Sequence, residues 1–344
     1  MNELGDAAAV VEGGSSGGGL RGSSEEASRE FVEDIVVVHE GGGVVHFLLI
    51  AYAPGDSGNA AGYVFRRPVG SDESAENILA TNDTLRELWC SPQGHVWATS
   101  STGLVWTSAP VPWVDTMPPD LEFDTPEGDV TWRHTALPAQ AHNRGRPNPA
   151  AVWGTSDDDV HIATFGGVLY HWNGRDWSQF HPGIGAPIGA IRGRAANDVY
   201  AAGYNSTLLH FDGTGWTRIA DPDGPDAADL LAGIAFDADG EVYVAGRSRG
   251  GRILRGSAQR GFSVAVRDRV GAIGVAFVEG RLFCAAGKGG VVELTARGPK
   301  TLRDDIAAWS IAEGEGRVYV TETPGEAAYS ELDLATGQWH RRYY

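Results

Sequence analysis

The stretch Val152–Phe180, VWGTSDDDVHIATFGGVLYHWNGRDWSQF, decides the fold because the chain repeats its pattern 39 residues later. The second copy, Ile191–Ile219, has the sequence IRGRAANDVYAAGYNSTLLHFDGTGWTRI. Aligned on Val160 and Val199, the two copies share turn residues and short apolar runs, while most other side chains differ. A repeat of this length has the size of one supersecondary unit, so we expect a repeated architecture.

Each copy predicts a set of short antiparallel strands. An apolar strand comes first, a turn containing Asp or Asn follows, and a second apolar strand begins at Val160 or Val199. A turn of small residues leads to a third strand, which ends at Asn173-Gly174 or Asp212-Gly213. These dipeptides tolerate positive φ at both central turn positions and therefore favour tight hairpins. A fourth strand, led by a tryptophan, completes the unit.

Five more stretches carry the same pattern with greater variation. A single four-stranded sheet cannot bury both of its faces alone, whereas a closed ring of such sheets can. A period of about 40 residues with four strands is typical of β-propeller blades. We therefore predict an all-β, seven-bladed β-propeller of four-stranded antiparallel blades over residues 31–344. The five further units are Glu33–Val69, Leu85–Ala136, Leu230–Val266, Ala272–Ala296 and Ala307–Tyr344.

The segment VWGTSDDDVHIATFGGVLYHWNGRDW resembles the blades of bacterial β-propeller repeat proteins. Their pattern is VWG-x-S-x-x-DVYAVG-x-x-G-x-I-x-HWDG-x-x-W, and the group is WD-repeat-like. The resemblance covers residues 150–220 of this chain. It implies the propeller fold and a tendency to bind other molecules, and it carries no shared catalytic residues onto this sequence.

The chain is strongly acidic, with a formal net charge of -18. Nucleic acids and anionic membranes bind to clustered Lys and Arg, so we expect neither as a partner. No apolar run approaches the roughly 18 residues of a membrane helix, and the first residues lack the regions of a secretory signal. We expect a cytoplasmic protein whose partner is another protein. Residues 1–30 are rich in Gly and Ser, which predicts a flexible, disordered tail.

The two cysteines, Cys90 and Cys284, each lie inside an apolar strand pattern. They belong to the second and the sixth unit, which are not neighbours in a ring of seven. A disulfide needs Cα atoms within about 7 Å of each other. We therefore predict two buried, free thiols.

Candidate metal and catalytic motifs are weak. Asp221–Asp229 gathers carboxylates as a Ca²⁺ loop would, but Asp226 and Ala232 stand where an EF-hand loop needs Gly and Glu. His171 and His210 are equivalent in successive units, which favours packing or a hydrogen bond over a metal site. The chain has no H-E-x-x-H or C-x-x-C motif. We predict no metal, no cofactor and no catalytic residue set.

Eleven tryptophans raise the possibility of stacking on sugar rings. Trp177, Trp216 and Trp339, however, occupy the same position in the outer strand of their units. A large aromatic residue at a repeated position is typical of core packing. We therefore favour packing between blades over a carbohydrate-binding role for these residues.

The loops on one face of a propeller usually carry its binding residues. Basic loops stand out in this acidic chain at Gly246–Arg252, at Gly287–Gly290 and in the long connection Pro138–Pro149. Strand order predicts that all three open on the same face, beside the turns that follow each second strand. The candidate binding residues there are His142, Arg144, Arg146, Phe165, Tyr204, Arg247, Arg249 and Lys288.

A second candidate is the insertion 110–128 within the second blade, which carries Trp113 among several prolines. It could fold onto the side of the propeller, or it could expose Trp113 as an anchor for a partner.

The function that this sequence favours is a non-enzymatic protein-interaction scaffold or binding module, such as an acidic adaptor or immunity-type protein. One alternative is a propeller enzyme, lactonase-like or lyase-like, with its site at the channel mouth. Another is a carbohydrate-binding propeller lectin. An enzyme would need carboxylates and histidine converging in the channel, and a lectin would show repeated aromatic pockets between blades.

Overall fold

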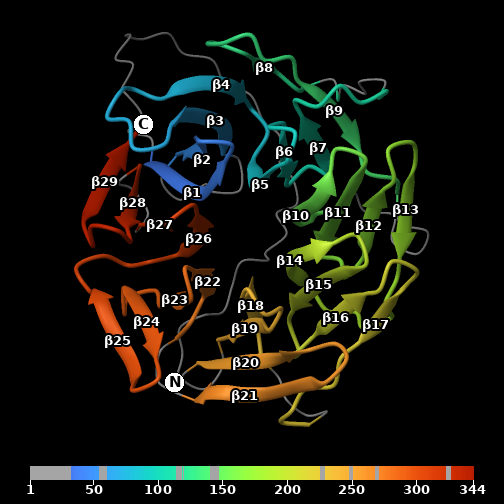
Figure 1. The fold of residues 1–344 in the computed structure, drawn as a ribbon. Coiled ribbons are helices and arrows are strands. Elements are labelled where there is room, and N and C mark those ends of the chain that lie inside the picture. The colour runs from blue at the N-terminus through green and yellow to red at the C-terminus, as the bar shows by residue number, and fades with distance from the viewer. Residues whose placement is uncertain are drawn as a thin grey trace, which may run out of the picture. The chain divides into compact units, whose positions relative to one another are not determined.

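The computed structural model describes residues 32–53, 60–113, 118, 120–139, 147–224, 229–247, 251–267, 271–322 and 327–344 (Figure 1). Contacts within the chain divide it into two units, 1–30 and 31–344, and every described residue belongs to the second. The tail predicted over 1–30 lies outside the described residues. All regular elements in the described part are strands. It contains no helix that is long and apolar enough to cross a membrane.

The strands form seven antiparallel sheets, which are the blades of a β-propeller, as the repeat predicts. Blade one contains β1 (Val32–Gly41), β2 (Val44–Tyr52), β3 (Ala61–Pro68), β4 (Glu76–Thr81) and β8 (Phe123–Asp124). Blade two contains β5 (Leu85–Cys90), β6 (Val96–Ser100), β7 (Leu104–Thr107) and β9 (Arg133–Ala136). Blade three contains β10 (Pro149–Ser156), β11 (Asp159–Thr164), β12 (Leu169–Trp172) and β13 (Trp177–Phe180).

The remaining blades each have four strands in sequence order. Blade four contains β14 (Ile188–Ala195), β15 (Asp198–Gly203), β16 (Leu208–Phe211) and β17 (Trp216–Arg218). Blade five contains β18 (Leu231–Phe236), β19 (Val242–Gly246), β20 (Arg252–Ser257) and β21 (Gly261–Arg267). Blade six contains β22 (Gly274–Val278), β23 (Arg281–Ala285), β24 (Val291–Thr295) and β25 (Gly298–Arg303). Blade seven contains β26 (Ser310–Gly314), β27 (Arg317–Thr321), β28 (Ala328–Asp333) and β29 (Trp339–Tyr343).

Blade one differs from the predicted four-stranded unit because it gains a fifth strand. Short strand β8 comes from the insertion 110–128 and pairs with β4, with Thr81 opposite Phe123. The side chain of Asn82 fixes this pairing, since it donates to the carbonyl of Asp120 at 2.7 Å and accepts from the Glu122 amide at 3.0 Å. The described end of the insertion therefore covers the outer edge of the first blade, where an open strand would otherwise expose its backbone groups.

A polar pair between the second and third strands recurs in five blades, and its polarity changes. In blades three and four the second strand supplies an aspartate and the third a histidine. In blade five the pair is Glu241 with Arg255 at 3.1 Å. In blades six and seven the charges are reversed, with Arg281 on Glu293 and Arg317 on Glu331, both at 2.8 Å. The fold thus requires a complementary pair at this place and not particular residues, which explains why the repeat keeps its pattern but varies its side chains.

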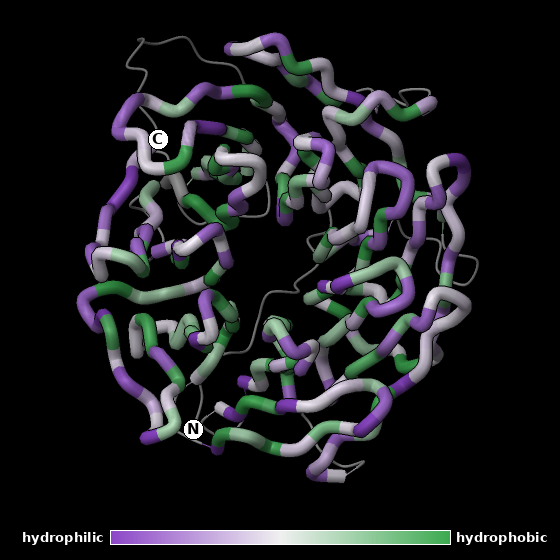
Figure 2. The backbone as a smooth tube through the Cα atoms, in the orientation of Figure 1, coloured by the Kyte–Doolittle hydropathy of each residue, from purple (hydrophilic) through white to green (hydrophobic). Residues whose placement is uncertain are grey.

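Neighbouring inner strands approach so closely that glycine is needed on one of them. A Cβ atom at Gly154 would lie 2.9 Å from the Trp89 ring of the preceding blade, and one at Gly193 would lie 2.5 Å from the ring of Trp153. Trp153 and Gly154 of blade three therefore pack against both neighbouring blades. Gly154 lies against the ring of Trp89 in blade two, and the ring of Trp153 lies against Gly193 in blade four. Hydrophobic stretches run along the strands, and many of the turns are hydrophilic (Figure 2).

The ring closes without a strand shared between its first and last blades, because blade seven is built only from C-terminal strands (Figure 1). The hydroxyl of Tyr319 in β27 donates to Glu40 Oε2 in β1 at 2.5 Å. Arg342 in β29 forms an ion pair with Asp72, which lies in the turn after β3. Aromatic rings add a second layer, with 5.5 Å between the centroids of Phe47 and Tyr329. Among the described residues, contacts that involve side chains therefore hold blade seven against blade one.

The two cysteines confirm the prediction made from blade order. Cys90 lies in β5 and Cys284 in β23, and both are buried and free. Burial raises the pKa of each thiol to about 12, because the uncharged form is favoured away from water.

The closing hydrogen bond gives a test of this interface. Tyr319→Phe removes the donor to a carboxylate, and we expect a loss of roughly 1.5–3 kcal/mol in the free energy of unfolding in urea. Tyr63→Phe in β3 is the matched control, since the Tyr63 hydroxyl makes no hydrogen bond to any described residue. If the two variants unfold at the same urea concentration, Tyr319 does not contribute to closure.

Candidate functional site

Two sets of connections come together on one face of the propeller. The turns between second and third strands donate backbone hydrogen bonds to the connections that enter the first strands, for example Phe165 N–H to the Asn148 carbonyl and Tyr204 N–H to the Pro187 carbonyl, both at 2.9 Å. Ser101 and Arg247 repeat this bond in blades two and five, whereas Gly287 of blade six donates to the Ala308 carbonyl in the connection that enters blade seven. We call this surface the loop face; its described parts are 83–84, 101–103, 147–148, 165–168, 186–187, 204–207, 229–230, 247, 286–290 and 308–309.

Three large aromatic side chains are exposed on the loop face. Phe165 is 37% exposed, Tyr204 44% and Trp309 42%. The guanidinium of Arg86 lies over the ring of Phe165 at 5.4 Å from its centroid. Phe165 and Tyr204 were predicted from the sequence, and Trp309 was missed. Its signal was a tryptophan directly before an inner strand, outside the repeated outer-strand position.

The basic residues predicted for this face are only partly described. Arg247 and Lys288 are exposed on the loop face, as expected from strand order. His142, Arg144, Arg146 and Arg249 lie outside the described residues, so their positions remain predictions.

Trp113, the candidate anchor of the insertion, is packed and only partly exposed. Its ring meets Trp97 of blade two edge-on at 5.4 Å and Trp172 of blade three at 5.5 Å. Trp177 lies 6.1 Å away on the same side. These contacts join the second and third blades, so we leave Trp113 out of the binding surface.

The acidic stretch that resembles a Ca²⁺ loop holds an arginine instead. Arg252 is buried and bonds to Asp221 at 2.5 Å, Asp223 at 2.7 Å and Asp229 at 2.8 Å. The hydrogen bonds that the guanidinium donates to Asp221, with those to Asp229, raise the pKa of the Arg252 side chain. The guanidinium satisfies these carboxylates, so the cluster fixes Asp221, Asp223 and Asp229 to β20 and does not need a metal ion.

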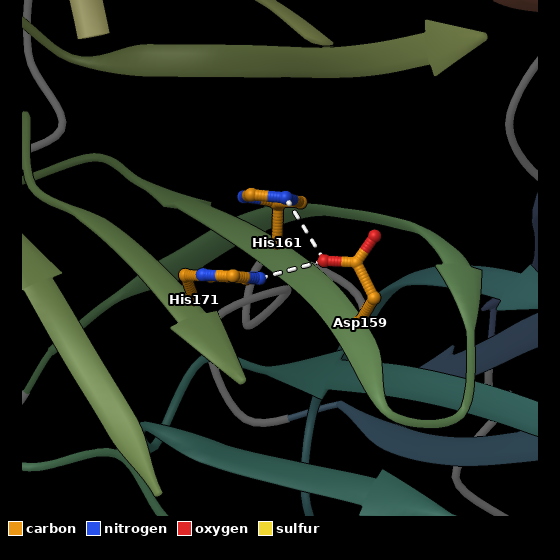
Figure 3. A group of neighbouring side chains, drawn as sticks. All are labelled: Asp159, His161 and His171. Carbon is orange, nitrogen blue, oxygen red and sulfur yellow. Dashed lines mark hydrogen bonds and ion pairs between the residues drawn. The ribbon is translucent and has the colours of Figure 1, made fainter. Parts of the chain in front are cut away.

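The second candidate metal group is Asp159, His161 and His171, all in blade three (Figure 3). His171 Nε2 lies 2.6 Å from Asp159 Oδ1, and the two imidazole rings stack at 4.2 Å with 4° between their planes. An ion between parallel rings would lie about 2 Å above each plane, whereas imidazole binds zinc in its ring plane at about 2.0–2.1 Å. Parallel stacking therefore gives the wrong geometry for chelation.

The position that His161 occupies in blade three carries an aromatic residue in other blades. Tyr200, Tyr243 and Tyr319 occupy the corresponding place in the second strands of other blades. Burial lowers the pKa of His161, and its ring packs at 5.2 Å from Phe211 of the next blade. We therefore assign this group to packing between blades three and four.

Two cavities lie along the central channel between the inner strands. The upper cavity, of about 220 Å³, opens beside Trp309 on the loop face and is lined by Glu87, Arg192 and Ser310 together with small residues. The lower cavity, of about 110 Å³, is lined by Arg192, His39 and Glu313 with several aromatic residues. Arg192 lines both. The small residues of the upper cavity are Ala151, Gly189, Ala190, Ala232, Gly233 and Gly274.

Arg192 is the electrostatic centre of the channel. Among the described residues its guanidinium makes one hydrogen bond, to the Ile191 carbonyl at 2.9 Å, and no ion pair. Burial raises the pKa of both Glu87 and Glu313, and the charge of Arg192 opposes the rise. Glu313 is an exposed residue, yet protein surrounds its carboxyl closely enough to have this effect. Burial and then the same guanidinium lower the pKa of His39 to about 3.

Comparisons with known proteins show the fold. No family model matches the chain, and no curated protein sequence matches it. The structure of a streptogramin B lyase is similar with a TM-score of 0.59 at 10% identity, over 76% of this chain and 84% of that one. The WD40 β-propeller domain of Doa1 gives 0.58 at 11% identity, over 86% and 93%. YCF48 bound to a D1 peptide gives 0.53 at 13% identity, over 76% and 81%.

These likenesses relate the chain in structure to WD40, YCF48 and lyase propellers. They include binding proteins and an enzyme on the same fold, so the fold alone does not choose between these functions. The comparisons support the propeller architecture that the blade pattern implied. They do not support membership of the bacterial repeat proteins whose blades the sequence resembles.

The buried histidines near the channel predict a pH dependence. Burial lowers the pKa of His39 to about 3 and that of His46 to about 4, from 6.5. As the pH drops, both imidazoles are therefore protonated in the unfolded chain before they are protonated in the folded protein. The free energy of unfolding falls as the pH drops below about 6.5. We expect a loss near 1.4 kcal/mol per pH unit for each histidine between pH 6 and pH 5.

Urea unfolding of the wild type and of His39→Gln across this pH range measures the effect. The variant lacks one of the two histidines, so its stability should fall with a shallower slope, and His39→Gln/His46→Gln should be shallower still. Equal slopes in all three proteins would contradict the burial of neutral imidazoles at these positions.

Proposed function

We propose that the protein is a non-enzymatic binding module that captures another protein through its loop face. The observation that carries this proposal is the group of exposed aromatic residues Phe165, Tyr204 and Trp309 on the face where the channel opens. Exposed tryptophan, tyrosine and arginine supply most of the binding free energy in protein interfaces. A folded protein gains nothing in its own stability from leaving such rings in water.

Charge narrows the choice of partner. The loop face carries Arg247 and Lys288, and Arg86 of β5 reaches over its Phe165 ring, in a chain whose net charge is -18. Complementary charge steers association, so an acidic segment of a partner fits this face and is repelled by the remaining surface. A basic loop face would repel a basic toxin. We therefore favour an adaptor role over the neutralisation of such a toxin.

A second candidate function is an enzyme with its site in the channel. One observation favours it: two carboxylates and an imidazole, those of Glu87, Glu313 and His39, lie within electrostatic range of Arg192. They are divided between the two cavities, however, and a pKa of about 3 is far from the neutral range that suits an acid–base catalyst. We therefore rank binding above catalysis.

A carbohydrate-binding role rests on one groove of about 300 Å³ between blades three and four, lined by Phe180, Phe211 and Trp216. A lectin built from repeated blades would offer the same groove at neighbouring interfaces. At the preceding interface the equivalent Trp177 packs with Trp113 and Trp172 instead. The groove is thus not repeated there, and we rank this role third.

The proposal is tested with a phage-displayed library of random linear peptides, selected against the immobilised full chain. We expect acidic peptides that bind the loop face. Phe165→Ala, Tyr204→Ala and Trp309→Ala should each weaken the selected peptides about tenfold or more, as measured by calorimetry.

Tyr343→Ala is the control, because Tyr343 is also exposed but lies on β29, in the outermost strand of blade seven. It should leave the affinity unchanged. Peptides that lose affinity equally with Tyr343→Ala, or that are insensitive to all three loop-face changes, would overturn the proposal.

A further inference from the structure

The upper cavity holds two opposite charges that do not neutralise each other. Glu87 in β5 and Arg192 in β14 both line it, but no ion pair joins them within the part of the chain that the structure describes. The Glu87 carboxyl accepts one weak hydrogen bond, from the Leu88 amide at 3.3 Å. Arg192 donates only to the Ile191 carbonyl. Each group thus keeps most of its hydrogen-bonding capacity free inside a protein cavity.

This arrangement differs from that of the buried charges of the propeller. Arg252 is surrounded by three aspartates, and Arg342 bonds to Glu331 and Asp72. A charge kept away from bulk water is costly unless a partner compensates it. Within the described ranges, the fold pairs those charges closely, whereas Glu87 and Arg192 interact only at longer range and form no ion pair. That difference indicates partners that come from outside the chain.

The walls between the two charges are small and largely apolar. At the level of Glu87 the other inner strands carry Ala151, Ala190, Gly233 and Gly274, followed by Ser310 in blade seven. The resulting space of about 220 Å³ is open beside Trp309. It has room for about seven water molecules, given that one occupies about 30 Å³ in the liquid, and so for a small organic ligand.

We propose that the upper cavity is a binding site for a small zwitterion of the amino-acid class. The ligand's carboxylate bonds to the Arg192 guanidinium, which matches the planar geometry of a carboxylate. Its ammonium group bonds to the Glu87 carboxylate, and its apolar body lies against the small residues and Trp309. One ligand then compensates both charges at once.

A ligand with only one charge fits this cavity less well. A simple anion would meet Arg192 but would face Glu87 as an unpaired like charge. A simple amine would bond to Glu87 and face Arg192 in the same way. Opposed charges of this kind give specificity by penalising the wrong ligand as well as by holding the right one.

This site does not depend on a protein partner at the loop face. The small ligand lies within the channel, and the exposed rings of Phe165 and Tyr204 take no part in it. Loss of peptide binding and loss of zwitterion binding can therefore be observed separately with the same protein.

The test begins with a thermal-shift screen of the full chain against each of the protein amino acids at millimolar concentration. We expect at least one with an apolar side chain, such as leucine, to raise the melting temperature. Calorimetry then compares leucine with isocaproate, which lacks its ammonium group, and with isoamylamine, which lacks its carboxylate. Each analogue should bind about tenfold or more weakly than leucine, because it leaves one charge unpaired.

Two variants assign the binding to this cavity. Arg192→Gln and Glu87→Gln should each weaken binding of the amino acid about tenfold or more while the chain still folds, as checked by circular dichroism. Arg194→Gln is the matched control, since Arg194 lies on the same strand but is exposed and paired with Asp198. It should bind normally.

Three results would overturn the inference. The first is that no amino acid shifts the melting temperature. The second is that isocaproate or isoamylamine binds as tightly as the amino acid. The third is that Arg192→Gln and Glu87→Gln bind like Arg194→Gln, which would place the ligand elsewhere.

Discussion

The contact between the first and last blades is the interaction on which the rest of this structure depends. Each blade buries its faces only against its two neighbours, so an open chain of seven would leave two apolar faces in water. No strand of the described part is exchanged between these two blades. The Tyr319–Glu40 hydrogen bond, the Arg342–Asp72 ion pair and the aromatic rings around Tyr329 hold them together through side chains.

Closure also creates the two features to which we assign function. It brings the inner strands around a common channel, so that Glu87 and Arg192 from different blades line one cavity. It also gathers the turns that carry Phe165 and Tyr204 with Trp309 of the last blade on one face. Trp309 comes from the last blade and Phe165 from the third, so this surface exists only in a closed ring.

The sequence predicted much of the fold because strand length and turns are local properties. The Asn-Gly and Asp-Gly turns identified the blades, and their order correctly predicted that Cys90 and Cys284 stay apart. Strand β8 was missed because it pairs with a blade other than the one in which it is inserted. The channel site was missed for a similar reason: Glu87 and Arg192 belong to different repeats, and only the closing angle of the ring brings them together.

The central claim, that the loop face is where this propeller binds its partner, is tested most directly by hydrogen–deuterium exchange with a selected peptide bound. The account predicts slower exchange at 165–168, 204–207 and 286–290 and around Trp309, where turn amides face the proposed partner. The outer strands β13, β17, β21 and β25 should exchange as they do in the free protein. Protection of those outer strands, with the loop face unchanged, would contradict the account.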